Sequence, residues 1–407
     1  MHAGVRTGLA ALGEPAFRRF LLEDAIGGSG LFVLQISLAW TVLQRTGSGA
    51  IVGLLQTALL LPIPLAIVVA GSLTDRFGPR RLMIGAWFAM GAVSAAFALM
   101  NALGALDVPA VLVLMAILGF FDGMYVVPSQ VLVGRAVDPR LMANAIGLSS
   151  LTVGIGRVIG GPLGGIALAA LGPTRALAIA AVTCAVAGSV CTRLPELAGF
   201  GGRTVRPWED VGGTLEWIRG SRPSLLVVLL GCAAAAFVYC YLAVTPLVVR
   251  DLLHGGSAEL GLLTAAGGVG AIAAAVSMDW LGKRLGRARL LLAALVAGGL
   301  SVAFAGLVSG STVTFTATAI LLLQATAPAR VRGRTLAVYN ALFYAVLPVS
   351  EASAGAASDR LGVGAVLIGA GILAIGAACA VRLLAPAFAA YDVDSTGRAS
   401  TARAGVG

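Results

Sequence analysis

Long apolar stretches recur along the whole chain, and this repetition constrains the fold more than any other feature. A transmembrane α-helix needs about 20 consecutive, mostly apolar residues, and each stretch is close to that length. We therefore predict an all-α membrane protein with twelve transmembrane helices. The twelve predicted spans are Phe20–Leu43, Ala50–Leu73, Leu82–Leu103, Pro109–Val127, Ala145–Leu171, Ala176–Arg193, Leu225–Val249, Leu260–Met278, Leu290–Val308, Thr312–Ala327, Leu336–Ser358 and Gly364–Leu384.

The composition agrees with a chain whose main solvent is lipid. Of the 407 residues, 58% are hydrophobic and 11% are charged, whereas an ordinary soluble protein has about 45–50% apolar and about 25% charged residues. A soluble fold of this size would lack the polar side chains that must cover its surface. This excludes a soluble enzyme, a nucleic-acid-binding protein, and a short membrane anchor that carries a large soluble domain.

The basic residues indicate the topology. When successive loops are assigned to opposite sides, 23 of the 28 Lys and Arg fall on the side of the termini, 4 fall on the other side, and Arg157 lies inside a span. Lys and Arg are enriched on the cytoplasmic side of membrane proteins. We therefore predict a multi-pass protein of the cell membrane with both termini in the cytoplasm. The net charge of +10 then reflects topology rather than a nucleic-acid partner.

The longest polar segment between spans divides them six and six. We predict an N-terminal half at residues 1–194, a cytoplasmic linker at 195–223, a C-terminal half at 224–385 and a disordered cytoplasmic tail at 386–407. Apolar and charged residues alternate in the linker between Trp208 and Arg219. That pattern suits either a short amphipathic helix on the membrane surface or a plain linker.

The two halves resemble each other in sequence. Asp75–Arg81, after the second span, has a weak counterpart in Lys283–Arg289 after the eighth, and Gly165–Gly172 matches Gly355–Gly362 at the ends of the fifth and eleventh spans. Internal repeats of this kind are typical of transporters whose substrate site lies near the bilayer midplane, at the repeat interface. The repeats predict two pseudo-symmetric halves of six helices.

The most specific motif follows the second span and reads Gly71-Ser-Leu-Thr-Asp-Arg-Phe-Gly-Pro-Arg-Arg81. It resembles the loop 2–3 signature of the major facilitator superfamily, G-x-L-a-D-R-x-G-R-[KR]-[KR], with Pro79 in place of the first basic residue. The resemblance implies the major facilitator fold and a gating loop whose aspartate pairs with basic groups and a helix terminus of the other half when the cytoplasmic side is closed. The expected gating residues are Gly71, Asp75, Arg76, Gly78, Arg80 and Arg81.

The fifth span contains a second motif. Small residues four apart share one helix face and allow close helix approach, and a proline bends the helix. The segment resembles the G-P-x-x-G-G motif associated with exporters of this superfamily, but it has Ile166 in place of the last glycine. The resemblance favours export, and close helix packing alone is the alternative. The motif residues are Gly156, Gly160, Gly161, Pro162 and Gly165.

Three further segments are similar to the enterobactin-exporter and macrolide-efflux branch of the superfamily. They are Phe17–Phe20, Asp138–Ala145 and Arg332–Arg334. One departure concerns the mechanism. Met115 stands in the fourth span where many drug/proton antiporters of the superfamily carry an arginine, so proton coupling through that arginine does not carry over.

Ionisable residues inside predicted spans are costly to insert and are candidates for function. Asp122, in the fourth span, and Glu351, in the eleventh, are the leading candidates for proton carriers. Burial favours the neutral form of a carboxyl, whereas access to water or to Arg157 favours the charged form. Arg157 and Glu351 either form a fixed ion pair or exchange partners during transport.

Two more acids, Glu23 and Asp24, lie near the cytoplasmic end of the first span. We expect cytoplasmic water, or a pairing with Arg18 and Arg19, to keep them ionised, which makes them second candidates. A cavity for an amphiphilic molecule needs aromatic and amide groups. Residues of this type inside the spans, which suit helix packing equally well, are Gln35, Tyr125, Tyr239, Tyr241 and Gln324.

The sequence contains neither the nucleotide motif G-x-x-x-x-G-K-[ST] nor H-E-x-x-H, and its only histidines are His2 and His254. We therefore predict a monomeric secondary transporter that needs no cofactor, metal or nucleotide. It exports small amphiphilic molecules, such as drugs, antibiotics or siderophores, by alternating access with proton antiport. The alternatives are an importer or passive facilitator of a small metabolite with the same fold and, from another class, an intramembrane enzyme.

Overall fold

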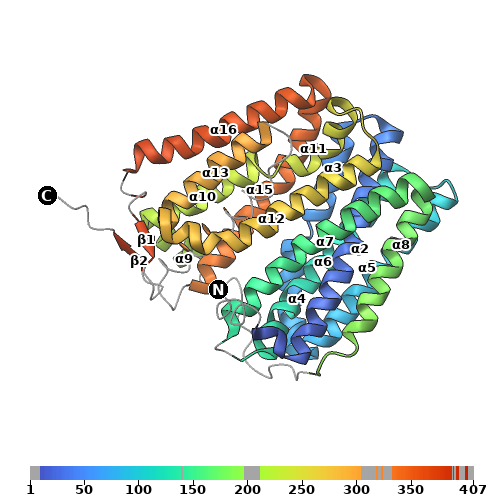
Figure 1. Ribbon diagram of the computed structural model, residues 1–407, viewed down its shortest axis with the longest axis horizontal. Coiled ribbons are helices and arrows are strands. Elements are labelled where there is room, and N and C mark those ends of the chain that lie inside the picture. Colours follow the sequence, from blue (N-terminus) through green and yellow to red (C-terminus); the bar gives the residue numbers. More distant parts are fainter. Residues whose placement is uncertain are drawn as a thin grey trace. The chain divides into compact units, whose positions relative to one another are not determined.

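The structure is a computed structural model, and helices make up nearly all of the chain that it describes (Figure 1). The described residues are 10–138, 141–196, 211–303, 315, 318–319, 322–323, 332–386, 388, 391–393 and 399–401.

The described residues up to 196 form a short 3₁₀-helix and seven α-helices. Their bounds are η1 Ala10–Gly13, α2 Pro15–Thr46, α3 Gly49–Leu60, α4 Ile63–Phe77, α5 Pro79–Ala102, α6 Val108–Ala136, α7 Met142–Leu171 and α8 Pro173–Cys191. Three of these helices, α2, α5 and α8, begin at a proline. Proline suits the first position because its fixed φ matches the helix and its missing N–H is not needed there.

The second half contains further helical segments and two strands. They are α9 Val211–Gly220, α10 Arg222–Phe237, α11 Tyr241–Leu247, the π-helix η3 Val248–Leu252, α12 Ser257–Leu285, α13 Arg287–Ala303, α15 Arg332–Leu361, α16 Val363–Leu384, β1 Tyr391–Val393 and β2 Ala399–Thr401. The strands pair antiparallel, with Asp392 opposite Ser400. They lie in the tail for which the sequence predicted disorder.

The predicted all-α membrane fold is confirmed. Nine helical segments in the described part of the chain are long and apolar enough to cross a membrane. In addition, α15 covers the predicted eleventh span and α13 covers residues 290–303 of the predicted ninth, the rest of which lies outside the described residues. The tenth predicted span, Thr312–Ala327, lies mostly outside the described residues, so the count of twelve stays a prediction. The second predicted span is two helices, because Pro62 and Pro64 interrupt the helical hydrogen bonds between α3 and α4.

Single glycines join four pairs of consecutive helices. Gly78, Gly172, Gly286 and Gly362 all have φ between 79° and 82°, and the next helix begins at the following residue each time. Only glycine adopts this backbone conformation without strain. The sequence placed Asp75–Arg81 in a loop. That placement is wrong, because Asp75 lies in the last turn of α4, Arg80 and Arg81 lie in the first turn of α5, and Gly78 alone joins them.

The chain forms two compact units. The first comprises residues 1–47, 54–204 and 249–269, and the second comprises 48–53, 205–248 and 270–407. In the first unit, α2 packs on α7 and α8, and α5 packs on α6 and α8. In the second unit, α10 packs on α15, and α13 packs on α16. The start of α3 therefore lies in the unit of α15, and the start of α12 lies in the unit of α7.

A helix, α9, forms in the predicted linker. The side chain of Ile218 is 3% exposed, whereas the charged Glu216 and Arg219 are exposed. One face of α9 is thus apolar and packed, while the other carries charge. Its place on a membrane surface stays a prediction.

Candidate functional site

Glu23, on α2, is fully buried between two hydrogen-bond donors. Trp87, on α5, donates its indole N–H to Glu23 Oε2 at 2.5 Å, and the hydroxyl of Tyr125, on α6, lies 2.9 Å from Glu23 Oε1. The sequence predicted cytoplasmic water, or the two preceding arginines, around this carboxyl group. That expectation is wrong for Glu23, because neighbouring helices enclose it and its partners are aromatic.

Asp24, the next residue on α2, shares the same tyrosine. Its Oδ1 lies 2.9 Å from the Tyr125 hydroxyl, and the Thr152 hydroxyl, on α7, contacts its Oδ2. The Thr152 hydroxyl also lies 2.6 Å from the carbonyl oxygen of Ser149. Asp24 is half-buried, so this carboxyl group is more accessible than that of Glu23.

We call Glu23, Asp24, Trp87, Tyr125 and Thr152 the acid cluster. Its five polar contacts are served by only three hydrogens, one from the indole N–H and one from each hydroxyl. An ionised carboxylate is an acceptor only, so two contacts would join oxygens with no hydrogen between them if both acids were ionised. One proton on each carboxyl group would supply the two missing hydrogens. The geometry therefore suits a cluster that binds a proton.

Sequence reasoning missed two members of this cluster, Trp87 and Thr152. The Trp87 ring lies 4.9 Å from the Tyr125 ring between centroids, and a Cβ at Gly27 would overlap the indole. A buried tryptophan usually finds a partner for its N–H, and Gly27 follows Glu23 by four residues on the same helix face. The need of a buried indole N–H for an acceptor, and a glycine one turn after Glu23, are the two sequence signals that could have indicated a contact between Trp87 and Glu23.

Asp122 lies one turn before Tyr125 on α6 and is half-buried. Residues three apart share a helix face, so Asp122 lies on the same face of α6 as Tyr125 of the acid cluster. It stays a candidate proton carrier.

Glu351, in the second unit, is fully buried on α15. Among the described residues, neither of its carboxyl oxygens has a hydrogen-bond partner. Tyr339 and Phe343 lie twelve and eight residues earlier on the same helix, with ring centroids 6.0 Å apart, and the ring of Tyr239 meets Phe343 edge-on at 5.2 Å. Glu351 therefore follows an aromatic row along one face of α15.

Arg157, on α7 in the first unit, is half-buried, and its Cζ lies 5.4 Å from the centroid of the Phe32 ring. This is within the range of a cation–π interaction. Arg157 and Glu351 belong to different units, and their pairing stays a prediction.

The glycines of α7 face two different helices. A Cβ at Gly156 would lie 3.2 Å from the backbone of Gly28, and a Cβ at Gly164 would lie 2.9 Å from Val33 Cα, both on α2. Gly160 faces α2 in the same way, 2.8 Å from Ser29 Cα by the same measure. The spacing of four indicated a face suited to close helix approach, and the structure shows that the helix packed on this face is α2.

The second glycine pair of α7 faces α12. A Cβ at Gly161 would lie 2.8 Å from the carbonyl oxygen of Gly261, and a Cβ at Gly165 would lie 3.1 Å from Ala258 Cα. Ser257 also donates its hydroxyl to the Gly165 carbonyl oxygen at 3.0 Å. Pro162 lies inside α7 between these contacts. One glycine face of α7 therefore packs closely on α2, and the other packs closely on α12.

A family model described as transmembrane secretion effector matches residues 6–403. The chain belongs to this family. It is accordingly a transporter of the major facilitator superfamily and a multi-pass membrane protein, as the loop 2–3 signature indicated.

Two relatives named multidrug efflux pump Tap are similar over most of their length. The protein of Mycolicibacterium fortuitum is 24% identical over 372 residues, which cover 86% of this chain and 90% of the relative. The protein of Mycobacterium tuberculosis is 26% identical over 380 residues, which cover 87% and 89%.

Solved structures support the fold of this secretion-effector chain. The D-xylose–proton symporter matches with a TM-score of 0.70 at 15% identity, covering 89% of this chain and 96% of that one. The nucleoside transporter NupG matches with a TM-score of 0.74 at 11% identity, covering 91% and 100%. At these identities the likeness concerns the fold alone.

Within the superfamily signature, the arginines bind the end of α8. Arg80 donates to the carbonyl oxygen of Thr192, and Arg81 forms an ion pair with Glu196 at 2.9 Å. Arg19, at the start of α2, donates to the carbonyl oxygen of Arg193 at 2.9 Å. Carbonyl groups after a helix end lack partners within the helix, so these arginines tie α2 and α5 to the end of α8.

The remaining signature residues lie in α4. Asp75 is half-buried in its last turn, and Arg76 Cζ lies 5.1 Å from the Phe77 ring centroid. Gly71 stands one turn before Asp75, and a Cβ at Gly71 would meet no atom within 4 Å among the described residues. A gating role for Asp75 stays a proposal.

The expected cavity residues lie in different surroundings. Tyr125 belongs to the acid cluster, and Tyr239 packs on Phe343. Gln35 and Tyr241 are half-buried on α2 and α11. Gln324 lies outside the described residues. A shared substrate cavity for these side chains stays a prediction.

Proposed function

We propose that this transporter exports small amphiphilic compounds across the cell membrane by alternating access, in exchange for protons, with both termini in the cytoplasm. Relatives named multidrug efflux pumps support the direction and the substrate class. The resemblance of the α7 glycines to the exporter motif supports the same direction. The distribution of Lys and Arg supports the topology.

The observation that carries proton coupling is the shortage of hydrogens in the acid cluster. Its members come from α2, α5, α6 and α7, so the site is assembled by packing within the first unit. Half-buried Asp24 is the entry point for a proton, while Glu23 lies behind it at full burial. Tyr125 contacts both acids and relays the proton between them.

In this scheme the inward movement of protons is coupled to the outward movement of the substrate. With one proton on Glu23 and one on Asp24, the cluster has five hydrogens for its five contacts, and α2, α6 and α7 can pack closely. Loss of both protons leaves two of these contacts as oxygen pairs without a hydrogen, which favours a rearrangement of these helices. Inward proton movement can therefore drive outward movement of the substrate.

Flux into proteoliposomes tests this function. Vesicles with an acidic lumen and a population of transporters whose cytoplasmic side faces outward should accumulate ethidium when the pH gradient is imposed. The double variant Glu23→Gln/Asp24→Asn should lose gradient-driven accumulation but keep ethidium exchange at equal concentrations. The control is Asp107→Asn, since Asp107 caps α6 locally by accepting from Ala110 N at 3.0 Å.

The same assay separates the alternatives. Undiminished gradient-driven accumulation in the double variant would refute the acid cluster as the proton site and transfer the role to Asp122 or Glu351, whose variants Asp122→Asn and Glu351→Gln are measured alongside. Wild-type flux that is indifferent to the pH gradient would refute antiport and favour a passive facilitator.

A further inference from the structure

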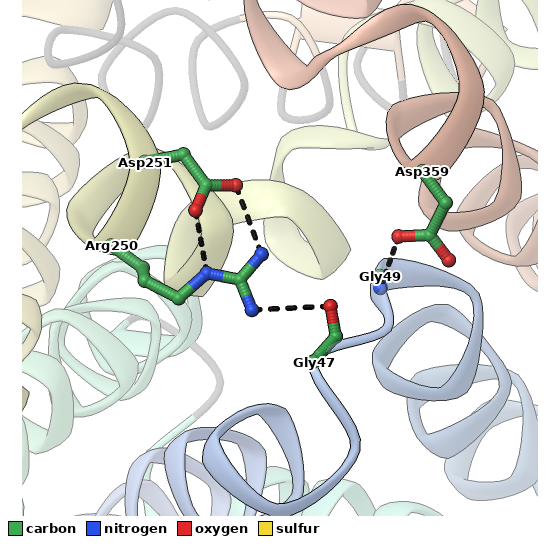
Figure 2. A network of polar contacts seen from close by, with 5 residues as sticks. All are labelled: Gly47, Gly49, Arg250, Asp251 and Asp359. Carbon is green, nitrogen blue, oxygen red and sulfur yellow. Dashed lines mark hydrogen bonds and ion pairs between the residues drawn. The ribbon is translucent and has the colours of Figure 1, made fainter.

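The end of α15 holds the beginning of α3. Asp359, in the last turn of α15, accepts a hydrogen bond from Gly49 N, at the start of α3, at 2.5 Å (Figure 2). It also accepts hydrogen bonds from Ser48 Oγ at 2.6 Å and from Ala50 N at 2.9 Å. The first N–H groups of a helix have no partner within the helix. A carboxylate from a residue more than 300 positions away therefore caps α3.

The segment around Asp359 repeats the superfamily signature. Gly355-Ala-Ala-Ser-Asp-Arg-Leu-Gly362 and Gly71-Ser-Leu-Thr-Asp-Arg-Phe-Gly78 share the pattern G-x-x-[ST]-D-R-[FL]-G. Asp359 in α15 thus occupies the position that Asp75 occupies in α4.

The two segments also have the same local structure. Gly78 has φ 81° and ψ 155°, and Gly362 has φ 82° and ψ 147°. Each glycine N–H donates four residues back, to Thr74 O at 2.9 Å and to Ser358 O at 3.0 Å. The segments 71–78 and 355–362 therefore resemble each other in backbone structure as well as in sequence.

A comparison with α12 shows what is particular to α3. Gly355 packs on Gly49 as Gly165 packs on the start of α12, because a Cβ at Gly355 would overlap the carbonyl group of Gly49. The start of α12 has an acid of its own, since Gly256 N donates to Glu259 Oε2 at 2.7 Å. Residues 49–60 contain no acid. The carboxylate at the start of α3 is therefore supplied by α15 rather than by α3 itself.

We propose that Asp359 is a positioning residue for alternating access and the outer counterpart of Asp75. It holds the first turn of α3 to the end of α15 in the conformation described here and releases it in the opposite one. This inference rests on the proposed alternating-access function. By the predicted topology, the end of α15 is extracellular and the end of α4 is cytoplasmic, so the two aspartates act on opposite faces of the membrane.

The test measures the ratio of the outer-closed to the outer-open conformation of the protein in nanodiscs, without substrate or a proton gradient. Spin labels at Gln44→Cys and Ala365→Cys, both on the predicted outer side, report the distance in a background without the five native cysteines. In Asp359→Asn the start of α3 loses its carboxylate cap. The ratio should therefore shift about 5- to 30-fold in favour of the outer-open conformation, which has the longer distance between the labels. Ser48→Ala, which leaves α15 unchanged, should shift the ratio in the same direction by a smaller factor.

Two comparisons separate a positioning role from a merely structural one. Asp75→Asn should shift the ratio in the opposite direction, and Asp75→Asn/Asp359→Asn should return it toward that of the wild type. Asp107→Asn, which removes a carboxylate cap of α6 on the same predicted side, should leave the ratio within about twofold.

A shift below twofold in Asp359→Asn, or a shift in the same direction as Asp75→Asn, would overturn the proposal. The outcome is independent of proton coupling, because no gradient is present. Flux in proteoliposomes that is indifferent to the pH gradient would refute proton antiport. If Asp359→Asn still shifted the ratio of conformations, the positioning role of Asp359 would nevertheless be supported.

Discussion

Gly160→Ala tests whether α2 and α7 approach as closely as the structure shows. The alanine Cβ would lie 2.8 Å from Ser29 Cα and 2.9 Å from Phe32 Cβ, whereas carbon atoms in contact lie about 3.5–4.0 Å apart. The helices must therefore separate by about 0.6–1.2 Å. Overpacking of this kind costs about 1–3 kcal/mol, and replacing a helical glycine by alanine returns about 0.5–1 kcal/mol.

The matched control is Gly85→Ala on α5, where no atom among the described residues lies within 4 Å of the new methyl group. It should gain about 0.5–1 kcal/mol from helix propensity alone. The free energy of unfolding in mixed micelles, followed by tryptophan fluorescence, should therefore differ between the two variants by the packing cost of about 1–3 kcal/mol. Equal stability of the two variants would refute the close approach.

Three further predictions concern the acid cluster, the gate and the topology. Trp87→Phe removes the indole donor from buried Glu23 and should lower the free energy of unfolding by about 1–3 kcal/mol; unchanged stability would show that this hydrogen bond is absent. Asp75→Asn should slow ethidium transport while leaving ethidium affinity within about twofold, since Asp75 lies at the end of α4; a loss of equilibrium binding would contradict a gating role. A C-terminal tag should react with antibody only after cells are permeabilised, and labelling of intact cells would overturn the topology.

Local periodicity was enough to predict the fold class and to show that the glycines of the fifth span suit close helix packing. Twelve apolar stretches indicate membrane helices because length and hydropathy are properties of each segment. Glycines four apart must share a helix face, and α7 accordingly presents Gly160 to α2 and Gly161 to α12. The interruption between α3 and α4 was also readable, since prolines stand at that point.

Contacts between distant segments could not be derived from these patterns. Asp24 was visible as an intramembrane acid, but its contact with Thr152 depends on how α2 packs on α7. The hydrogen bonds from the start of α3 to Asp359 join residues more than 300 positions apart. The helical end of α4 was missed because the whole of Asp75–Arg81 was assigned to the loop, whereas Gly78 alone joins α4 and α5.

Proton release on substrate binding tests most directly whether the acid cluster couples protons to transport. Purified protein in weakly buffered solution, with a pH indicator that does not bind the protein, is titrated with ethidium. The wild type should release protons as ethidium binds, and Glu23→Gln/Asp24→Asn should bind ethidium without releasing them, while Asp107→Asn should behave like the wild type. Equal proton release from the wild type and the double variant, or none from the wild type, would contradict the account.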